Sequence, residues 1–175
     1  MHPDYADSSN HINDICLIKV PPLSVAAPED CNDCFRPVCL PTPGTSGDSF
    51  AGQYCWIAGW GTISSGGNTS NKIRDAGVNI FSRDYCLEKT VYTSDAIDSM
   101  LHMCAGIPDT DNDGESDGGI DSCQGDSGGP LVCLIDNVPV QVGVTSWGHG
   151  CADKNTAGVY VNVAAYLDWI HDVMN

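Results

Sequence analysis

Short apolar and β-branched runs, separated by clusters of Gly, Pro, Asn and Ser, constrain the fold of this chain most strongly. Such runs lie at residues 15–20, 53–58, 76–81, 131–135, 138–147 and 158–161. Runs of this length between turn-forming residues predict strands. No internal repeat of about 20 to 50 residues and no strand–helix alternation is present, which disfavours solenoids and doubly wound sheets. We therefore expect an all-β fold.

The C-terminal residues follow a helical pattern instead. Apolar side chains recur there at helical spacing, namely Val163, Leu167, Ile170 and Met174. Charged and polar side chains occupy the other face, namely Asp168, His171 and Asp172. This pattern predicts an amphipathic helix over residues 163–175 that packs through its apolar stripe. Prolines at 21–22, 28 and 41–43 indicate a linker between two packed units.

Ten cysteines in 175 residues favour a disulfide framework and a secreted, extracellular protein. Cys31 and Cys34 have the spacing of a zinc-binding pair, but no second such pair follows. A structural zinc ion is therefore disfavoured.

The net charge of −16, from 7 basic and 23 acidic residues, repels nucleic acid and anionic membranes. The negative charge also favours cationic substrates, although the need for solubility explains most of this charge. No apolar run approaches the roughly 18 residues that span a bilayer. Residues 1–13 are polar where a signal peptide is apolar, so we expect the C-terminal part of a longer secreted protein.

The run Asp121 to Pro130, with the sequence DSCQGDSGGP, places a serine between glycines. Glycine lets the backbone bend sharply and approach a reacting carbonyl group closely. The amides of Gly125 and Ser127 are then candidates for an oxyanion hole. This pattern predicts acyl transfer with Ser127 as the nucleophile.

The motif GDSGGP at 125–130 resembles the nucleophile motif of the chymotrypsin/trypsin family of serine endopeptidases. The segment NDICLI at 13–18 resembles the family segment that carries the triad carboxylate, and Asp14 is the match. The resemblance implies two six-stranded β-barrels and a C-terminal helix. Residues 1–38 then correspond to the end of the first barrel and a linker, and residues 39–175 to the second barrel with its helix. We therefore expect an incomplete first barrel.

Two parts of the family's catalytic machinery have no match here. The base lies in an Ala-Ala-His-Cys context in the family, and none of the five histidines has it; His149 is a remote substitute. The acid before the nucleophile, here Asp126, pairs in the family with an ammonium group freed by activation. Without that partner, we expect Asp126 to turn elsewhere and the oxyanion loop to be disordered or collapsed. The chain alone is then inactive.

The resemblance also implies a specificity. Asp121, six residues before Ser127, matches the base of the primary pocket, where an acid selects Arg or Lys. Gly148 and Gly158 match pocket walls that must lack side chains. The substrate backbone is expected to pair with Ser146, Trp147 and Gly148. Protein or peptide substrates with Arg or Lys are therefore the expected partners.

Disulfides follow from the same resemblance: Cys55–Cys133, Cys86–Cys104 and Cys123–Cys151. Cys39 matches a cysteine that tethers a preceding propeptide or light chain in many relatives. Cys16 replaces an apolar residue, so a buried free thiol is expected there.

An acidic insertion precedes Asp121. Its sequence, DTDNDG at 109–114, has the opening of a calcium loop with Asp109, Asp111 and Asp113 as ligands, but Ile120 replaces the closing glutamate. A solvated insertion is therefore favoured over weak calcium binding, and no cofactor is expected. Asn68 opens an N-glycosylation sequon in a Gly/Ser-rich loop.

These patterns favour a trypsin-like serine endopeptidase. The alternative is a noncatalytic homologue that binds a partner through the same cleft, and the retained Ser127, Asp14 and Asp121 argue against it. A disulfide-rich structural or calcium-binding module does not explain why these residues coincide with the two wall glycines.

Overall fold

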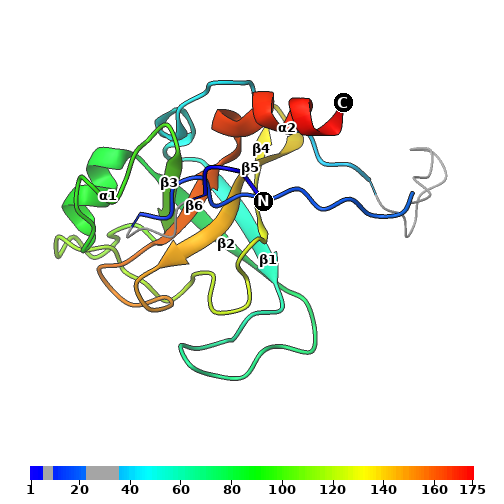
Figure 1. Ribbon diagram of the computed structural model, residues 1–175. Helices are drawn as coiled ribbons and strands as arrows, with labels where there is room; N and C mark the ends of the chain where they lie inside the picture. Colours follow the sequence, from blue (N-terminus) through cyan, green and yellow to red (C-terminus); the bar gives the residue numbers. More distant parts are fainter. Residues whose placement is uncertain (6–9, 23–35) are drawn as a thin grey trace.

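A computed structural model describes residues 1–5, 10–22 and 36–175 (Figure 1). Six antiparallel strands form a closed barrel in the order β1-β2-β3-β6-β5-β4. Their bounds are β1 Tyr54–Gly59, β2 Arg74–Phe81, β3 His102–Gly106, β4 Pro130–Ile135, β5 Val138–Gly148 and β6 Gly158–Asn162. Closure leaves no strand of this sheet with an unpaired edge.

Five of the six predicted runs are strands, with bounds shifted by at most a few residues. Strand β3 was not predicted, because all five of its residues are buried and no polar–apolar alternation marks it. The connection from β4 to β5 is a two-residue turn in which Asp136 and Asn137 have φ values of 52° and 63°. Positive φ at both positions is typical of a type I′ turn, whose twist matches the adjoining strands.

The barrel interior is an apolar core closed by one disulfide. Cys55 on β1 and Cys133 on β4 are directly paired in register and joined by an S–S bond. Other fully or nearly fully buried side chains surround this bond, namely Ile57, Val78, Ile80, Leu131, Val142 and Tyr160. Inward-facing residues from neighbouring strands thus fill the barrel interior.

Two α-helices flank the barrel in the described residues, and a short 3₁₀ helix, Gly47–Phe50, precedes β1. Helix α1, Arg83–Lys89, begins at Ser82, whose hydroxyl group accepts a hydrogen bond from the Tyr85 amide. Its seven residues are too few for a recognisable period, so the sequence did not predict it. The predicted terminal helix is a short 3₁₀ helix, Val163–Tyr166, followed by α2, Leu167–Met174. The prediction that Met174 packs inward is wrong: its side chain is 72% exposed because the helix ends beyond the core.

The N-terminal segment lies along the barrel and α2 and forms no strand in its described residues. The predicted strand at 15–20 is therefore wrong. Ile15 is buried against Val161 and Leu167, whereas residues 16–20 are exposed. A strand needs a neighbour for its backbone groups, and the sheet that would provide one is not formed here. The fold is all-β, with one complete barrel, an incomplete first barrel and a C-terminal helix.

None of the helices in the described part of the chain is long and apolar enough to cross a membrane.

Candidate active site

One cavity joins the two residues that the sequence analysis placed at the centre of the site. It has a volume of about 200 Å³, and its lining includes both Asp121 and Ser127. The remaining lining comes from three segments: Ser122 to Gln124, Thr145 to Gly148 with Gly150 and Cys151, and Gly158. All the residues predicted to bind substrate, Asp121, Ser146, Trp147, Gly148 and Gly158, therefore meet in one place.

Asp121 lies in a poorly hydrated position within this cavity. Its Oδ1 accepts a 2.8 Å hydrogen bond from the Ser122 amide, and its Oδ2 accepts a 3.3 Å bond from the Ala152 amide. Burial dominates over these donors and raises the pKa of Asp121 to about 6. Since no described basic side chain forms an ion pair with it, this carboxylate is suited to receive a cationic ligand group.

The glycine opposite Asp121 has no room for a side chain. A Cβ atom at Gly158 would lie 2.6 Å from Oδ1 of Asp121 and 2.9 Å from the Tyr160 hydroxyl oxygen. Gly148, on the other wall, is less confined, because its nearest neighbour would lie at 3.4 Å. The pocket thus depends on glycine more strictly at 158 than at 148.

A β-bulge in β5 positions Ser146. The pairing of β5 with β6 shifts between Thr145 and Trp147, which leaves Ser146 opposite no partner residue. Bulges of this kind redirect a side chain. The Ser146 hydroxyl group donates a 2.6 Å hydrogen bond to Oδ2 of Asp14, which is half-buried. The predicted triad carboxylate therefore lies beside the cavity that Ser127 lines.

Ser127 is exposed at the end of the loop before β4. The loop is held by hydrogen bonds from the amides of Asp126, Gly128 and Gly129 to carbonyl groups. Among the described residues, the amides of Gly125 and Ser127 donate no hydrogen bond within the chain. These are the two amides predicted to form the oxyanion hole, and they are available to an incoming oxygen.

The Asp126 carboxylate accepts hydrogen bonds from two backbone amides. Its Oδ1 accepts a 2.7 Å hydrogen bond from the Gly61 amide, and its Oδ2 accepts a 3.0 Å bond from the Cys123 amide. A Cβ atom at Gly59 or Gly61 would collide with this carboxyl group. The expected reorientation is present, but the expected collapse of the loop is not, because two amides compensate the charge.

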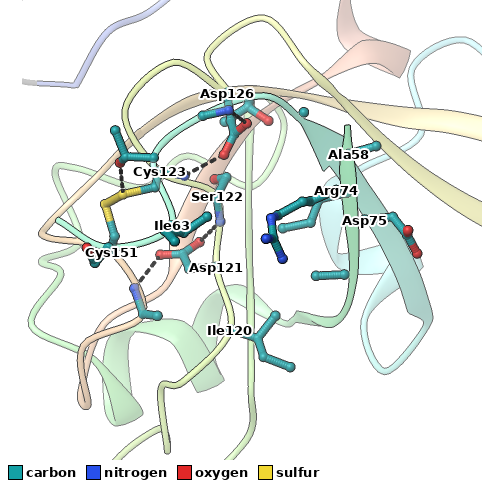
Figure 2. A pocket seen from close by; sticks show the side chains of 18 of the residues that line it. Ala58, Ile63, Arg74, Asp75, Ile120, Asp121, Ser122, Cys123, Asp126 and Cys151 are labelled. Atoms are coloured by element: carbon teal, nitrogen blue, oxygen red, sulfur yellow. Dashed lines mark hydrogen bonds between the residues drawn. A yellow bond between two sulfur atoms is a disulfide. The ribbon is translucent and has the colours of Figure 1, made fainter. Parts of the chain in front are cut away.

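A second cavity, of about 290 Å³, shares part of its lining with the first. Figure 2 shows this second cavity. Five residues line both cavities, namely Asp121, Ser122, Cys123, Thr145 and Cys151, so they lie between the two. Asp126 lies at one side of the second cavity, and Arg74 extends into it from β2.

The three predicted disulfides are present: Cys55–Cys133, Cys86–Cys104 and Cys123–Cys151. The last one joins two walls of the substrate cavity. Cys16 and Cys39 have free, exposed thiols, so the expectation that Cys16 is buried is wrong. Residues 16–20 leave the barrel surface, which explains its exposure. The Cys31 and Cys34 pair lies outside the described residues.

No histidine in the described part of the chain lines the substrate cavity. His11 and His149 approach it through ring contacts with Trp147, at centroid distances of 6.0 and 6.2 Å. His102 is buried on β3, and burial lowers its pKa. His2 packs against Trp169, and His171 is exposed on α2. The sequence-based conclusion that no position carries the base stays a prediction.

Sequence reasoning missed Ser122, which lines the cavity, and Tyr160, which contacts Ser122 and the pocket wall. The Tyr160 hydroxyl group donates a 3.2 Å hydrogen bond to Ser122 Oγ, and burial raises the Tyr160 pKa. Tyr160 follows Gly158 by two positions on β6, so strand alternation places both on one face. That alternation was the available signal for Tyr160. Ser122 directly follows Asp121 in the motif.

Two further predicted positions lie outside the cavity. Asn68 is exposed in the long connection between β1 and β2, where a glycan has room. In the acidic insertion, the structure brings together Asp109, Asp111 and Asp117. Asp113, which was predicted as a ligand, instead pairs with Lys154.

The barrel, the nucleophile loop and the acid at the base of the cavity define a trypsin-like serine protease domain. The sequence matches the family described as Trypsin over residues 1–170, and the chain belongs to this family.

Two relatives illustrate the similarity. The chain is 41% identical over 172 residues to Transmembrane protease serine 5 of Homo sapiens, covering 98% of this chain and 34% of that protein. It is 38% identical over 179 residues to Tryptase of Mus musculus, covering 97% of this chain and 58% of that protein. The chain thus spans between about a third and three fifths of these relatives.

Proposed function

We propose that this chain is the substrate-recognising part of an endopeptidase that cleaves after Arg or Lys. The observation that carries the proposal is the shared cavity of Asp121 and Ser127. A substrate cation bound at Asp121 would hold the following peptide bond near the Ser127 hydroxyl group. An apolar side chain would leave the carboxylate desolvated and unpaired, which is the physical basis of discrimination.

Roles for the other site residues follow the family pattern. We infer that Asp14 orients and stabilises the histidine base of the complete enzyme. We assign the oxyanion hole to the amides of Gly125 and Ser127, which are unused within the chain. The edge at Ser146, Trp147 and Gly148 would pair with the substrate backbone.

Asp126 is proposed as the activation switch. Its carboxylate borders the second cavity, which an incoming N-terminal ammonium group freed by proteolysis would enter (Figure 2). That ammonium group would pair with the Asp126 carboxylate, whose charge is now compensated by the amides of Gly61 and Cys123. Residues 1–175 alone are proposed to be inactive, because none of their histidines is positioned as the base.

The exposed thiol of Cys39 is proposed to form a disulfide with a segment outside these residues. Its backbone is fixed against β5 by hydrogen bonds to Pro139 and Gln141, which holds the sulfur at the surface. The disulfides within the barrel support an extracellular location.

The test compares short Arg, Lys and Phe esters as substrates of the complete gene product after limited proteolysis. We expect cleavage of the Arg and Lys esters, and loss of that preference in Asp121→Ser. Asp136→Asn, which removes a carboxylate from the exposed β4–β5 turn, serves as the matched control. Preference for the Phe ester, or an unchanged preference in Asp121→Ser, contradicts the specificity.

The same assay separates the alternative. A noncatalytic homologue would bind an aromatic amidine at Asp121 but cleave none of the esters after activation. The observation that supports this alternative is that no described histidine lines the cavity.

A further inference from the structure

We propose that the acidic insertion at residues 109–117 binds one calcium ion between the carboxylates of Asp109, Asp111 and Asp117. The insertion contains none of the residues that line the cavity of Asp121 and Ser127. The proposal concerns metal binding by the chain itself and does not depend on protease activity.

The three carboxylates are already gathered at a suitable separation. One oxygen from each lies within 4.8 Å of one oxygen from each of the others. Calcium binds oxygen ligands at about 2.3–2.6 Å, so two ligands of one ion are separated by at most about 5 Å. A single ion can therefore contact all three groups, with its remaining positions filled by water or backbone oxygens.

Asp117, which is partly buried, supports the proposal independently of this spacing through one of its carboxylate oxygens. Its Oδ2 accepts hydrogen bonds from the Thr110 amide, at 3.1 Å, and from the Thr110 hydroxyl group. Its Oδ1 is closed off from solvent and has no hydrogen-bond partner within the described part of the protein. A buried, unpaired carboxylate oxygen is costly, and a cation shared with Asp109 and Asp111 would remove that cost.

The local charge also favours a divalent cation. Five acidic residues lie in the insertion, namely Asp109, Asp111, Asp113, Glu115 and Asp117. In the part of the chain that the structure describes, two basic side chains form ion pairs with them: Lys89, at 3.3 Å from Asp109, and Lys154, which pairs with Asp113 and Asp111. The Lys154 side chain is 44% exposed and can move into solvent when a metal binds.

Part of the site is rigid. The side chain of Asp109 is only 7% exposed, and its amide donates a 2.7 Å hydrogen bond to the Tyr85 hydroxyl group. Ser116 is fully buried and is bonded to the carbonyl groups of Lys89 and Thr156. The ion would thus complete a partly preformed loop, which favours calcium over the more demanding octahedral magnesium.

The missing bidentate glutamate places the expected affinity in the range of extracellular calcium modules, with a Kd of roughly 10⁻⁴ to 10⁻³ M. The sequence pattern predicted Asp113 as the third ligand, whereas the structure groups Asp117, three positions beyond Gly114, with Asp109 and Asp111.

Terbium luminescence excited through the protein's aromatic side chains tests the site in the whole 175-residue chain. Tyr85 lies against Asp109 and is positioned to sensitise bound terbium. We expect a saturable signal that millimolar calcium removes and the same concentration of magnesium does not. In Tyr85→Phe, most of the signal should disappear while calorimetry still detects calcium. An unchanged signal would locate the metal elsewhere and overturn the proposal.

Variants assign the ligands. Asp117→Asn and the exposed Asp111→Asn should each weaken calcium binding at least ten-fold, whereas Asp136→Asn, with the same charge change, should bind normally. Lys154→Met should bind two-fold or more tightly, because a competing cation is removed. Circular dichroism confirms folding, and Asp111→Asn carries the test if Asp117→Asn unfolds. Normal affinity in the folded ligand variants, or no saturable binding by the wild-type chain, refutes the site.

Discussion

The Ser146 hydroxyl group donates a 2.6 Å hydrogen bond to Asp14, although 132 positions separate these residues in the sequence. The bond connects the N-terminal segment to the wall of the substrate cavity. It also occupies one oxygen of the carboxylate that we propose orients the catalytic base. Substrate binding and base orientation therefore meet at one side chain of β5.

Replacing Ser146 by alanine should slow catalysis by the complete, activated gene product. A hydrogen bond to a charged group contributes about 1.5–3 kcal/mol, so kcat/KM for an Arg ester is expected to fall roughly ten-fold or more. Ser146→Thr retains the hydroxyl group and is the control. Equal activity of the Ala and Thr variants would show that this bond has no role in catalysis.

Binding of an aromatic amidine to the chain should depend on pH through Asp121. The cation binds the ionised carboxylate, and the pKa of that group is raised to about 6 by burial. Affinity is expected to be constant above about pH 7 and to fall towards ten-fold per unit well below pH 6. Calorimetric titrations between pH 4.5 and pH 8, at constant ionic strength, measure this profile. A midpoint near 4 would mean that the carboxylate is well hydrated.

The same carboxylate should make the fold less stable at neutral pH. Because its pKa is higher in the folded chain than in the unfolded chain, the folded state holds more protons between about pH 4 and 6. Stability from this group is therefore lost as the pH rises through that window. Asp121→Asn should raise the free energy of unfolding by about 1–2 kcal/mol at pH 7.5 and by little at pH 3.5. Denaturant unfolding at both pH values, beside Asp136→Asn, measures the difference; an equal effect at both contradicts the assignment.

Gly158 should tolerate alanine less well than Gly148. A Cβ atom at 158 would overlap the Asp121 carboxylate, whereas one at 148 would make only ordinary contacts. We expect Gly158→Ala to cost about 1–3 kcal/mol of stability and to abolish amidine binding. Gly148→Ala should fold with nearly unchanged stability. Urea unfolding midpoints compare the two, and similar midpoints would contradict this description of the pocket wall.

The disulfides should contribute unequally to stability. Cys55 and Cys133 are separated by 78 positions, and Cys86 and Cys104 by 18. Loop-closure entropy predicts a loss of about 4.5 kcal/mol when the first pair is replaced by alanine, against about 3 kcal/mol for the second. Thermal unfolding of the two double variants measures the order. The opposite order would indicate that packing around the sulfur atoms outweighs chain entropy.

The sequence predicted the strands whose residues alternate or end at turn residues, and it failed where those signals are absent. β3 has its whole length buried, and α1 is only two turns long. The segment at 15–20 shows the reverse case: its composition suits a strand, but no neighbouring strand is present to pair with it. Pairing partners are a property of the tertiary structure and leave no local mark in the sequence.

For the site, motif spacing located the groups that act chemically but not their supports. Asp121 and Ser127 were predicted from one motif, and the structure places both on one cavity. The contact of Tyr160 with Ser122 and the donors to Asp126 depend on how distant strands meet. The gathering of Asp117 with Asp109 depends likewise on the path of the loop between them.

The two cavities share five lining residues, namely Asp121, Ser122, Cys123, Thr145 and Cys151, so Asp121 borders both of them. A small molecule bound in the second cavity would contact this carboxylate without entering the first cavity, where we propose that peptides bind. Inhibitors of that design would be noncompetitive with substrate. The selectivity of such inhibitors among related proteins would depend on side chains of the second cavity, such as Arg74, rather than on Asp121.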